Sequence, residues 1–360
     1  NLKLSYYSNI IINKLYSMRG ILIIISNFSS LQKLKEKLLL IWRKFAWIKN
    51  KNSNFIYQRL NVEHLIRQKG NNISTYNINK HSFSENKDIF NQWLVGFTDG
   101  DGTFSIVRQN NKWSLTFKIS QNTYNLRVLH FIKKQIKAGS IYIDKKNNHA
   151  HFRIRDRKIL ESVIFPIFDK YSLLTTKQFN YIKFKEAYAI LSNSYLTKLE
   201  KDILIFKLLD TNSPVDFISP IWSLIENNVS NFESASKIMT KAWLVGFTEA
   251  EGSFYLVNKS TNRLVHGFEI TQKLDKIVLI AIKHILGIST KVKVTKLGTF
   301  SIVTTNSRAI ENIIKYFKNS MKGMKALEYR IWTRAYVKYK GEYLALKKIR
   351  QQMRKMKTIK

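Results

Sequence analysis

Cysteine is absent from the 360-residue sequence, proline occurs only three times, and Asp and Glu together number only 24. The absence of cysteine excludes disulfide bonds, thiolate metal sites and cysteine nucleophiles. Long apolar runs are also scarce. The stretch Gly20–Ile25 is too short to span a bilayer, and the basic residues around it do not fit a signal peptide. We therefore expect no stable membrane span.

Positive charge is abundant instead. Lys and Arg number 61, which gives a formal net charge of +37 that is spread along the whole chain. A folded protein tolerates such self-repulsion more readily when a polyanion neutralises it, and nucleic acid suits a basic chain with 13% aromatic residues. Hydrophobic residues make up 44%, so most of the chain should fold. A basic protein of a membrane surface or of a ribosome is the alternative.

One peptide occurs twice at a constant offset. Residues 93–102 read Trp-Leu-Val-Gly-Phe-Thr-Asp-Gly-Asp-Gly, and residues 243–252 read Trp-Leu-Val-Gly-Phe-Thr-Glu-Ala-Glu-Gly. The stretch from the start of one copy to the start of the other is too long for a solenoid repeat. It indicates two copies of a domain. Apolar and polar residues alternate after each copy, as in strands with one buried face.

We predict an α+β fold, in which two pseudo-symmetric αββαββα repeats place their antiparallel sheets in a saddle, plus an N-terminal basic helical extension. An amphipathic helix is expected over Leu31–Lys44, and residues 71–86 have the Asn- and Ser-rich composition of a loop. The predicted segments are a basic N-terminal extension (1–87), a first repeat (88–193), a linker (194–236), a second repeat (237–346) and a basic tail (347–360).

The repeated peptide predicts a close pair of helices. Each copy has small residues one turn apart, which let two helix backbones approach. We expect the first helix to end near Gly102, because a glycine at a helix terminus permits a left-handed turn. The small residues are Gly96 and Gly100 in the first copy and Gly246 and Ala250 in the second, and the two copies of the peptide end at Gly102 and Gly252.

The helix pair should bring Asp101 and Glu251 side by side. Two carboxylates at helix C-termini repel each other and the helix dipoles, and a divalent cation removes this conflict. Oxygen ligands without nearby Cys or His favour Mg²⁺. We therefore predict that both acids are catalytic and bind metal, with the adjoining Gly100 and Ala250 as further metal contacts, for metal-assisted phosphodiester hydrolysis.

Two alternatives accompany this prediction. The repeated peptide could be only a packing helix with solvated acids, although two copies with matched acids argue against this. Asp99 and Glu249 could also join a cluster of four ligands. We interpret them as structural hydrogen-bond acceptors, because residues two apart do not face the same side of a helix.

The motifs at residues 94–102 and 244–252 resemble the two motifs of a single-chain LAGLIDADG homing endonuclease, and the resemblance covers about residues 88–340. Ile-Phe-Asp-Lys-Tyr-Ser-Leu-Leu-Thr at 167–175 and Met-Lys-Gly-Met-Lys-Ala-Leu-Glu-Tyr at 321–329 are similar to fungal mitochondrial intron-encoded members. Some members of that branch are RNA maturases for their own group I intron. The resemblance implies a mitochondrial monomer that makes a Mg²⁺-dependent double-strand break in intronless target DNA.

The resemblance also implies polar residues around the metals. The last acid of each motif would bind them, which again selects Asp101 and Glu251. Gln121 corresponds to Gln272, and Lys177 to Lys325. These four side chains are candidates to position water and to offset charge on the reacting phosphate, although the two lysines could also be ordinary surface residues.

Polar positions of the predicted strands are candidates for DNA contacts. Arg153 and Arg155 could contact guanine or only phosphate. His149 and His151 alternate on one strand, and we interpret them as polar groove residues because no third metal ligand is near in sequence. The predicted DNA-binding residues are Ser105, Ser114, Thr116, Lys118, Arg153 and Arg155 in the first repeat and Ser253, Lys291, Lys293 and Ser301 in the second.

Three functions therefore compete. A site-specific DNA endonuclease explains the paired acids. A maturase that stabilises group I intron RNA would use basic surface outside the saddle, including residues 1–87 and 347–360, and would need no metal. A purely structural basic protein leaves the acids unexplained. The first two functions can coexist on one chain.

Overall fold

The computed structural model describes residues 78–358. The predicted helix at Leu31–Lys44 and most of the predicted extension lie outside the described residues. No helix within residues 78–358 combines the length and apolarity that a membrane crossing needs.

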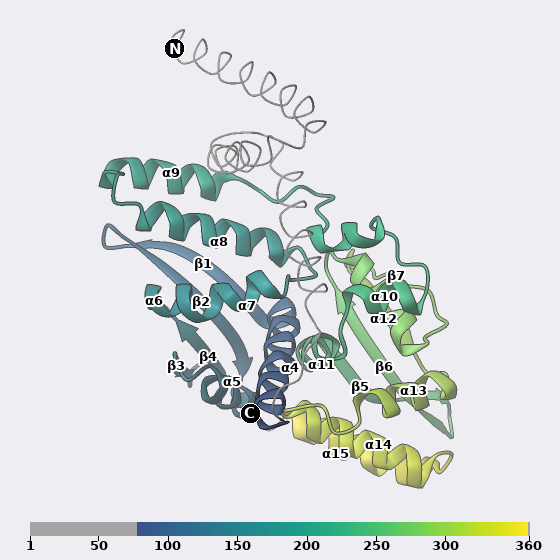
Figure 1. Cartoon of the computed structure of the whole chain (residues 1–360). Helices are drawn as coiled ribbons and strands as arrows, with labels where there is room; N and C mark the ends of the chain where they lie inside the picture. The colour runs from purple at the N-terminus through teal and green to yellow at the C-terminus, as the bar shows by residue number, and fades with distance from the viewer. Residues whose placement is uncertain (1–77, 359–360) are drawn as a thin grey trace, which may run out of the picture. The chain divides into compact units, whose positions relative to one another are not determined.

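Two series of helices and strands follow one another in the same order (Figure 1). The first series comprises α4 (Ile78–Asp101), β1 (Gly102–Gln109), β2 (Lys112–Asn122), η2 (Thr123–Asn125), α5 (Leu126–Ile136), β3 (Ser140–Asp144), β4 (His149–Ile154), α6 (Arg157–Ile159), the π-helical turn η3 (Leu160–Ile164), α7 (Phe165–Lys170) and α8 (Lys177–Ser192). The second comprises α11 (Lys241–Glu251), β5 (Gly252–Ser260), β6 (Arg263–Gln272), α12 (Lys276–Leu286), β7 (Lys293–Val294), β8 (Phe300–Thr304), α13 (Ser307–Phe317), α14 (Lys325–Tyr339) and α15 (Tyr343–Thr358).

Each series forms one four-stranded antiparallel sheet. The strand orders are β1-β2-β4-β3 and β5-β6-β8-β7, and the registers correspond, since Gly102 is opposite Ile119 as Gly252 is opposite Ile270. The tight turn between β1 and β2 has positive φ at Asn110 and at Asn111, as expected for a two-residue hairpin. The predicted α+β fold of two repeats is confirmed.

Strand alternation separates a helix-covered face from an open face in each sheet. In β2, Leu115, Phe117 and Ile119 are buried, whereas Ser114 and Lys118 point to the other face and remain partly exposed. The apolar residues join one core with the helices that cover that face. The other face is left open by the helices of residues 78–358, and its side chains are mostly polar.

Some boundaries differ from the predictions. Helix α4 begins at Ile78, so residues 78–86 are helical rather than loop, because a helix anchored in the core extends at little cost. The predicted linker contains α9 (Lys198–Asp210), η4 (Pro220–Ile225) and α10 (Phe232–Ile238). The predicted tail belongs to α15, whose Leu346 and Met353 are buried, so apolar spacing makes it a packed helix.

The prediction of a left-handed turn at Gly102 is wrong, and the equivalent Gly252 has no such turn either. Gly252 has φ −74°, and Gly102 is not among the positive-φ residues. Both glycines are required by crowding instead. A Cβ on Gly102 would overlap the side chain of Thr98, and one on Gly252 would lie 2.5 Å from the Thr248 methyl carbon.

Candidate active site and nucleic-acid surface

Helices α4 and α11 approach each other through their glycines. A Cβ added to Gly96 would overlap the main-chain carbonyl oxygen of Trp243, and one on Gly246 would overlap that of Trp93. One turn further, a Cβ on Gly100 would overlap the Ala250 methyl group. The predicted close approach is confirmed, since only residues of this size leave room for the two backbones.

Asp101 and Glu251 are the last residues of these two helices. Burial raises the pKa of Asp101, and a hydrogen bond from Gln121 opposes the rise. Burial also raises the pKa of Glu251, and the negative charge of Asp101 raises it further. The two carboxylates are therefore near enough to repel each other, as the helix pairing predicts.

Two glutamines donate hydrogen bonds to these acids. Gln121 Nε2 donates to Asp101 Oδ2 at 2.5 Å, and Gln272 bonds to Glu251, which lowers the pKa of that acid. Asn125 Nδ2 donates to Gln121 Oε1 at 2.7 Å, so the Gln121 amide is oriented with its NH₂ group toward Asp101. The structure thus places both predicted glutamines beside the predicted acids.

The ammonium groups of two lysines lie at the C-terminal ends of α4 and α11. Lys177 Nζ donates to the carbonyl oxygen of Gly100 and, at 3.1 Å, to that of Thr98. Lys325 Nζ donates to the Gly252 carbonyl oxygen at 2.7 Å and lies 3.7 Å from a Glu328 carboxylate oxygen. Both are the first residues of their helices, α8 and α14, so the predicted equivalence holds in the structure.

Burial and the nearby acids have opposite effects on the pKa of Lys177. Burial lowers the pKa of Lys177, while the charges of Asp99, Asp101 and Glu251 counteract that effect. Lys177 in turn favours ionised Asp101 and Glu251. The site therefore combines two partly desolvated carboxylates with basic groups of opposite charge.

Asp99 and Glu249 point into the protein. Asp99 accepts hydrogen bonds from the Leu174 and Thr175 amides and, at 2.8 Å, from Trp243 Nε1 in the opposite repeat. Burial raises the pKa of Asp99 to about 6. These contacts agree with a structural hydrogen-bonding role for Asp99.

Glu249 has the mirror-image contacts. Its Oε1 atom accepts the Lys322 and Gly323 amides at 2.6 Å, and its Oε2 atom accepts Trp93 Nε1 at 2.7 Å. Each acid therefore ties its own repeat to a tryptophan of the other. These bonds hold α4 and α11 together just above Asp101 and Glu251.

The oxygen atoms at the helix ends suit a hard cation such as Mg²⁺. They comprise the carboxylates of Asp101 and Glu251 and the adjoining carbonyl groups. The Gly100 carbonyl already accepts a hydrogen bond from Lys177, which competes with a metal contact there. No group of three or more His, Asp or Glu side chains within residues 78–358 forms a metal cage. A cation would therefore need water or phosphate oxygen to complete its ligands.

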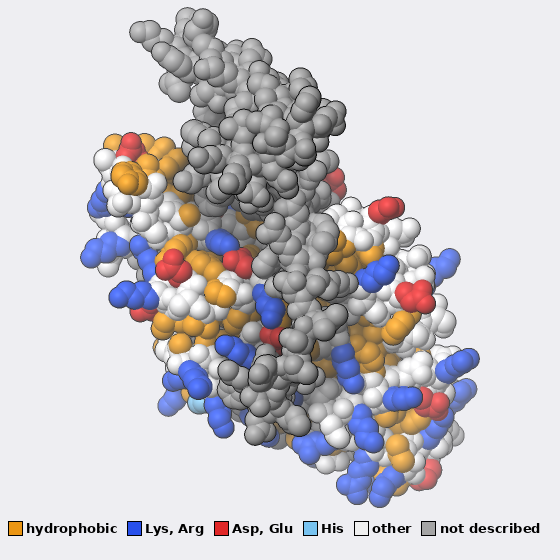
Figure 2. All heavy atoms as spheres, viewed as in Figure 1, with side chains coloured by type: hydrophobic (Ala, Val, Ile, Leu, Met, Phe, Trp, Pro, Cys, Tyr) orange, Lys and Arg blue, Asp and Glu red, His pale blue; other side chains and the backbone are white. Residues whose placement is uncertain are grey.

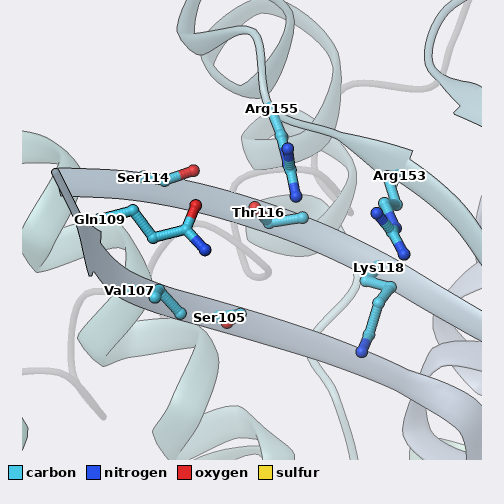
Figure 3. Close-up of a pocket in the computed structure, with 8 residues that line it drawn as sticks. All are labelled: Ser105, Val107, Gln109, Ser114, Thr116, Lys118, Arg153 and Arg155. Atoms are coloured by element: carbon cyan, nitrogen blue, oxygen red, sulfur yellow. The ribbon is translucent and has the colours of Figure 1, made fainter. Parts of the chain in front are cut away.

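The open face of the first sheet forms a hollow (Figure 3). Arg153 lies over the ring of Tyr142, 4.7 Å from its centroid, which holds the guanidinium above the sheet. The hollow brings together all six residues of the first repeat that were predicted from the polar positions of its strands. The hollow is lined by Ser105, Ser114, Thr116, Lys118, Arg153 and Arg155, together with Val107 and Gln109, which were not predicted.

In the second sheet, the four residues predicted to contact DNA lie in unlike surroundings. Ser253 and Ser301 lie on the open face, but Ser301 is only 6% exposed and donates to Glu269. Lys293 is exposed on β7, whereas Lys291 precedes that strand, because β7 has only two residues.

His149 and His151 lie on the open face of the first sheet. His151 Nδ1 is 2.9 Å from Ser120 Oγ, and its ring stacks between those of His149 and Tyr142. This arrangement agrees with polar groove residues.

Figure 2 shows that Lys and Arg side chains outnumber Asp and Glu over the visible surface of the described residues.

Two residues that follow the glutamines in sequence were not predicted. Asn125 and Asp275 occupy the N-cap positions of α5 and α12, a few residues after Gln121 and Gln272. Their place just after each glutamine was the available signal. Their contacts to the opposite repeat could not be inferred from spacing within one repeat.

Comparison with known proteins agrees with this architecture. Residues 94–188 and 244–336 match the model of the LAGLIDADG endonuclease family. The chain is 41% identical over 289 residues to "Probable intron-encoded endonuclease Cox1-I1b" of Schizosaccharomyces pombe, covering 77% of this chain and 71% of that protein. It is 30% identical over 233 residues to "Uncharacterized mitochondrial protein RF1" of Saccharomyces cerevisiae, covering 62% of this chain and 43% of that protein.

The fold also matches a solved structure. The meganuclease I-SmaMI bound to uncleaveable DNA with a TTCT central four superposes with a TM-score of 0.60 at 24% identity. The match covers 75% of this chain and 99% of that one. The family model matches both repeats and includes the two helix ends where the acids lie. The chain belongs to the LAGLIDADG endonuclease family.

Proposed function

We propose that this protein is an intron-encoded, site-specific DNA endonuclease that uses Mg²⁺ to make a double-strand break in intronless target DNA. The observation that carries the proposal is the convergence of Asp101 and Glu251 at the ends of two helices in van der Waals contact. The name of the Schizosaccharomyces pombe relative and the DNA-bound meganuclease support it.

In this proposal, Asp101 and Glu251 hold the cation. When bound, Mg²⁺ supplies positive charge against the phosphate and Lewis acidity toward water. Gln121 and Gln272 orient the two carboxylates through their NH₂ groups. Lys177 and Lys325 place ammonium groups beside the same helix ends, where they offset negative charge that develops on phosphate oxygen.

The open sheet faces are proposed to hold the DNA. In the first repeat, Lys118, Arg153 and Arg155 give the hollow a positive potential that suits phosphate and guanine. In the second repeat, Glu269 occupies the register position of Lys118, so the two faces differ in charge. We therefore expect two half-sites of unlike sequence.

A second function, group I intron RNA maturase, is favoured by a separate basic surface. Helix α15 packs against the helix-covered side of the second sheet through Leu346, beside Leu256 and Leu264. Its exposed side carries Lys347, Lys348 and Arg354, away from the open sheet faces. Folded RNA would bind such a surface through its phosphates.

Loss of one acid tests the nuclease proposal. We expect Asp101→Asn to reduce cleavage in Mg²⁺ by at least about 10³-fold, because it removes a charged group from the reacting centre. The substrate comes from a DNA library of intronless alleles, with sequencing of the cut ends. Unchanged circular dichroism and melting temperature provide the folding control.

Cleavage at the wild-type rate by Asp101→Asn would refute the assignment of Asp101. RNA splicing support, measured with the same variant, should persist if a separate surface carries it. We also propose a mitochondrial location, from the name of the Saccharomyces cerevisiae relative, and a monomer, since both motifs lie on one chain.

A further inference from the structure

The loop before each active-site lysine is bonded to the opposite repeat. Thr176 directly precedes Lys177, and its amide donates to Asp275 Oδ1 at 2.8 Å. The Thr176 hydroxyl also donates to Asp275 Oδ2 at 3.3 Å. Asp275 belongs to the second repeat, whereas Thr176 and Lys177 belong to the first.

The second lysine has the mirror-image arrangement. Met324 directly precedes Lys325, and its amide donates to Asn125 Oδ1 at 2.8 Å, across from the second repeat to the first. A Cβ on the neighbouring Gly323 would lie 2.6 Å from Asn125 Oδ1, so the loop is seated closely on this side chain. Two unlike sequences thus form the same contact.

Neither acceptor serves its own helix. Asp275 and Asn125 occupy the N-cap positions of α12 and α5, where such side chains usually accept an amide of the first turn. Both lack a side-chain capping bond. Asp275 is also buried, with 7% of its surface exposed. Asp275 therefore leaves its own helix without a side-chain cap. It accepts hydrogen bonds instead from Thr176, the residue before Lys177 in the other repeat.

We propose that Asp275 is a positioning residue that holds Lys177 of the opposite repeat at the helix end, and that Asn125 does the same for Lys325. This inference rests on the proposed nuclease function. Each repeat thus supplies a side chain that positions the lysine beside the acid of the other repeat. The two strand cleavages depend on contacts between the repeats, and loss of one contact impairs one strand more than the other.

The test measures each strand separately. Target DNA labelled on either strand is cut by the full chain in Mg²⁺, and a supercoiled plasmid reports nicked and linear products. We expect Asp275→Ala to slow one strand about tenfold or more and to accumulate nicked plasmid. The affected strand should be the one that Lys177→Ala slows, while DNA affinity changes less than about twofold.

Two further changes address folding and specificity. Thr176→Pro removes the same amide donor from the other side of the bond, and Thr176 already has φ −56°, which proline adopts. Met324→Pro, at φ −66°, removes the equivalent donor in the second repeat and should slow the opposite strand, as Lys325→Ala does. Asn125 itself is unsuitable because it also bonds Gln121.

Conservative rescue separates positioning from general stability. Asp275→Asn keeps an oxygen that accepts the Thr176 amide and should recover most of the rate that Asp275→Ala loses. Asp216→Ala and Asn212→Ala, at exposed positions between the repeats, are the matched controls and should leave both strand rates unchanged.

The outcomes are distinguishable. If wild-type protein cuts DNA but Asp275→Ala and Thr176→Pro slow both strands equally, or neither, the inference is overturned while the nuclease function stands. The same holds if Lys177→Ala shows no strand preference. If wild-type protein cuts no DNA in Mg²⁺, the proposed function fails and the inference fails with it.

Discussion

One side-chain difference between the repeats concerns proton binding. Asp275 is ionisable, whereas its counterpart Asn125 is neutral, although both accept an amide from the opposite repeat. Burial raises the pKa of Asp275 to about 7, and the charge of Asp99 contributes in the same direction. The folded protein therefore binds a proton at Asp275 at a pH where an unfolded chain has released it.

The resulting pH dependence has a definite sign. The unfolded pKa is the usual 3.8, below the folded value of about 7, so this group's contribution to stability is fully present below about pH 4. It is lost as the pH rises through 7. We expect the free energy of unfolding of Asp275→Asn, relative to wild type, to rise by at least about 1 kcal/mol between pH 5 and pH 8, since a tenfold change in proton affinity corresponds to about 1.4 kcal/mol.

Urea unfolding in EDTA measures this difference without interference from metal. Asn125→Asp, which places a carboxyl at the equivalent site, should show the opposite trend. Parallel stability curves for wild type and Asp275→Asn across this pH range would contradict the prediction.

Residues of the site were predictable where local geometry decides their position. Asp101 and Glu251 follow from helix periodicity and small-residue spacing, because both are properties of one helix. Lys177 and Lys325 follow from matching positions in the two repeats. Asp275 was not predictable, because its partner Thr176 comes from the other repeat and no local pattern encodes that distance.

At the scale of elements, the α4–α11 pair positions the acids. Gly246→Ala places a methyl group on the carbonyl oxygen of Trp93, and backbone atoms cannot move aside as a flexible side chain can. We expect a loss of about 3 kcal/mol in the free energy of unfolding, typical of severe overpacking. Chemical denaturation measures it.

Gly298→Ala is the control for adding the same methyl group. Nothing lies within 4 Å of its Cβ position, and φ is +74°, so only the left-handed backbone adds a cost of about 1 kcal/mol. Equal losses in the two variants would mean that the helices separate easily.

Most helices and strands were predictable, because alternation and helical spacing persist over whole segments. The αββαββα order predicted for each repeat is found in both series of elements. Helix α7 and the short extent of β7 were missed. The first is a brief helix beginning beside Pro166, and the second is an edge strand whose length depends on pairing with β8.

At the scale of the molecule, the open faces of the two sheets differ in charge along one cross-strand row. Lys118 lies between Thr103 and Arg153, whereas Glu269 lies between Ser253 and Val303. Aligned positions therefore carry opposite charge. The pseudo-symmetry of the backbone does not extend to the potential over the sheets.

Charge reversal at these two positions should have opposite effects on DNA binding. We expect Lys118→Glu to weaken affinity for target DNA about tenfold and to reduce the salt dependence by about one ion, because a phosphate contact is lost. Glu269→Lys should strengthen binding, especially to unrelated DNA. Fluorescence anisotropy over a salt series measures both, and changes of the same sign would contradict the proposed binding faces.

The crossed bonds of Trp93 to Glu249 and Trp243 to Asp99 constrain how this gene can recombine. A repeat transplanted from a relative would fold correctly only if it brought an indole and an acid that meet those of its new neighbour. A substitution at any of these four positions requires a compensating substitution at its hydrogen-bond partner in the other repeat. We therefore expect exchange of one repeat alone to destabilise the protein, whereas residues of the open sheet faces are free of this constraint.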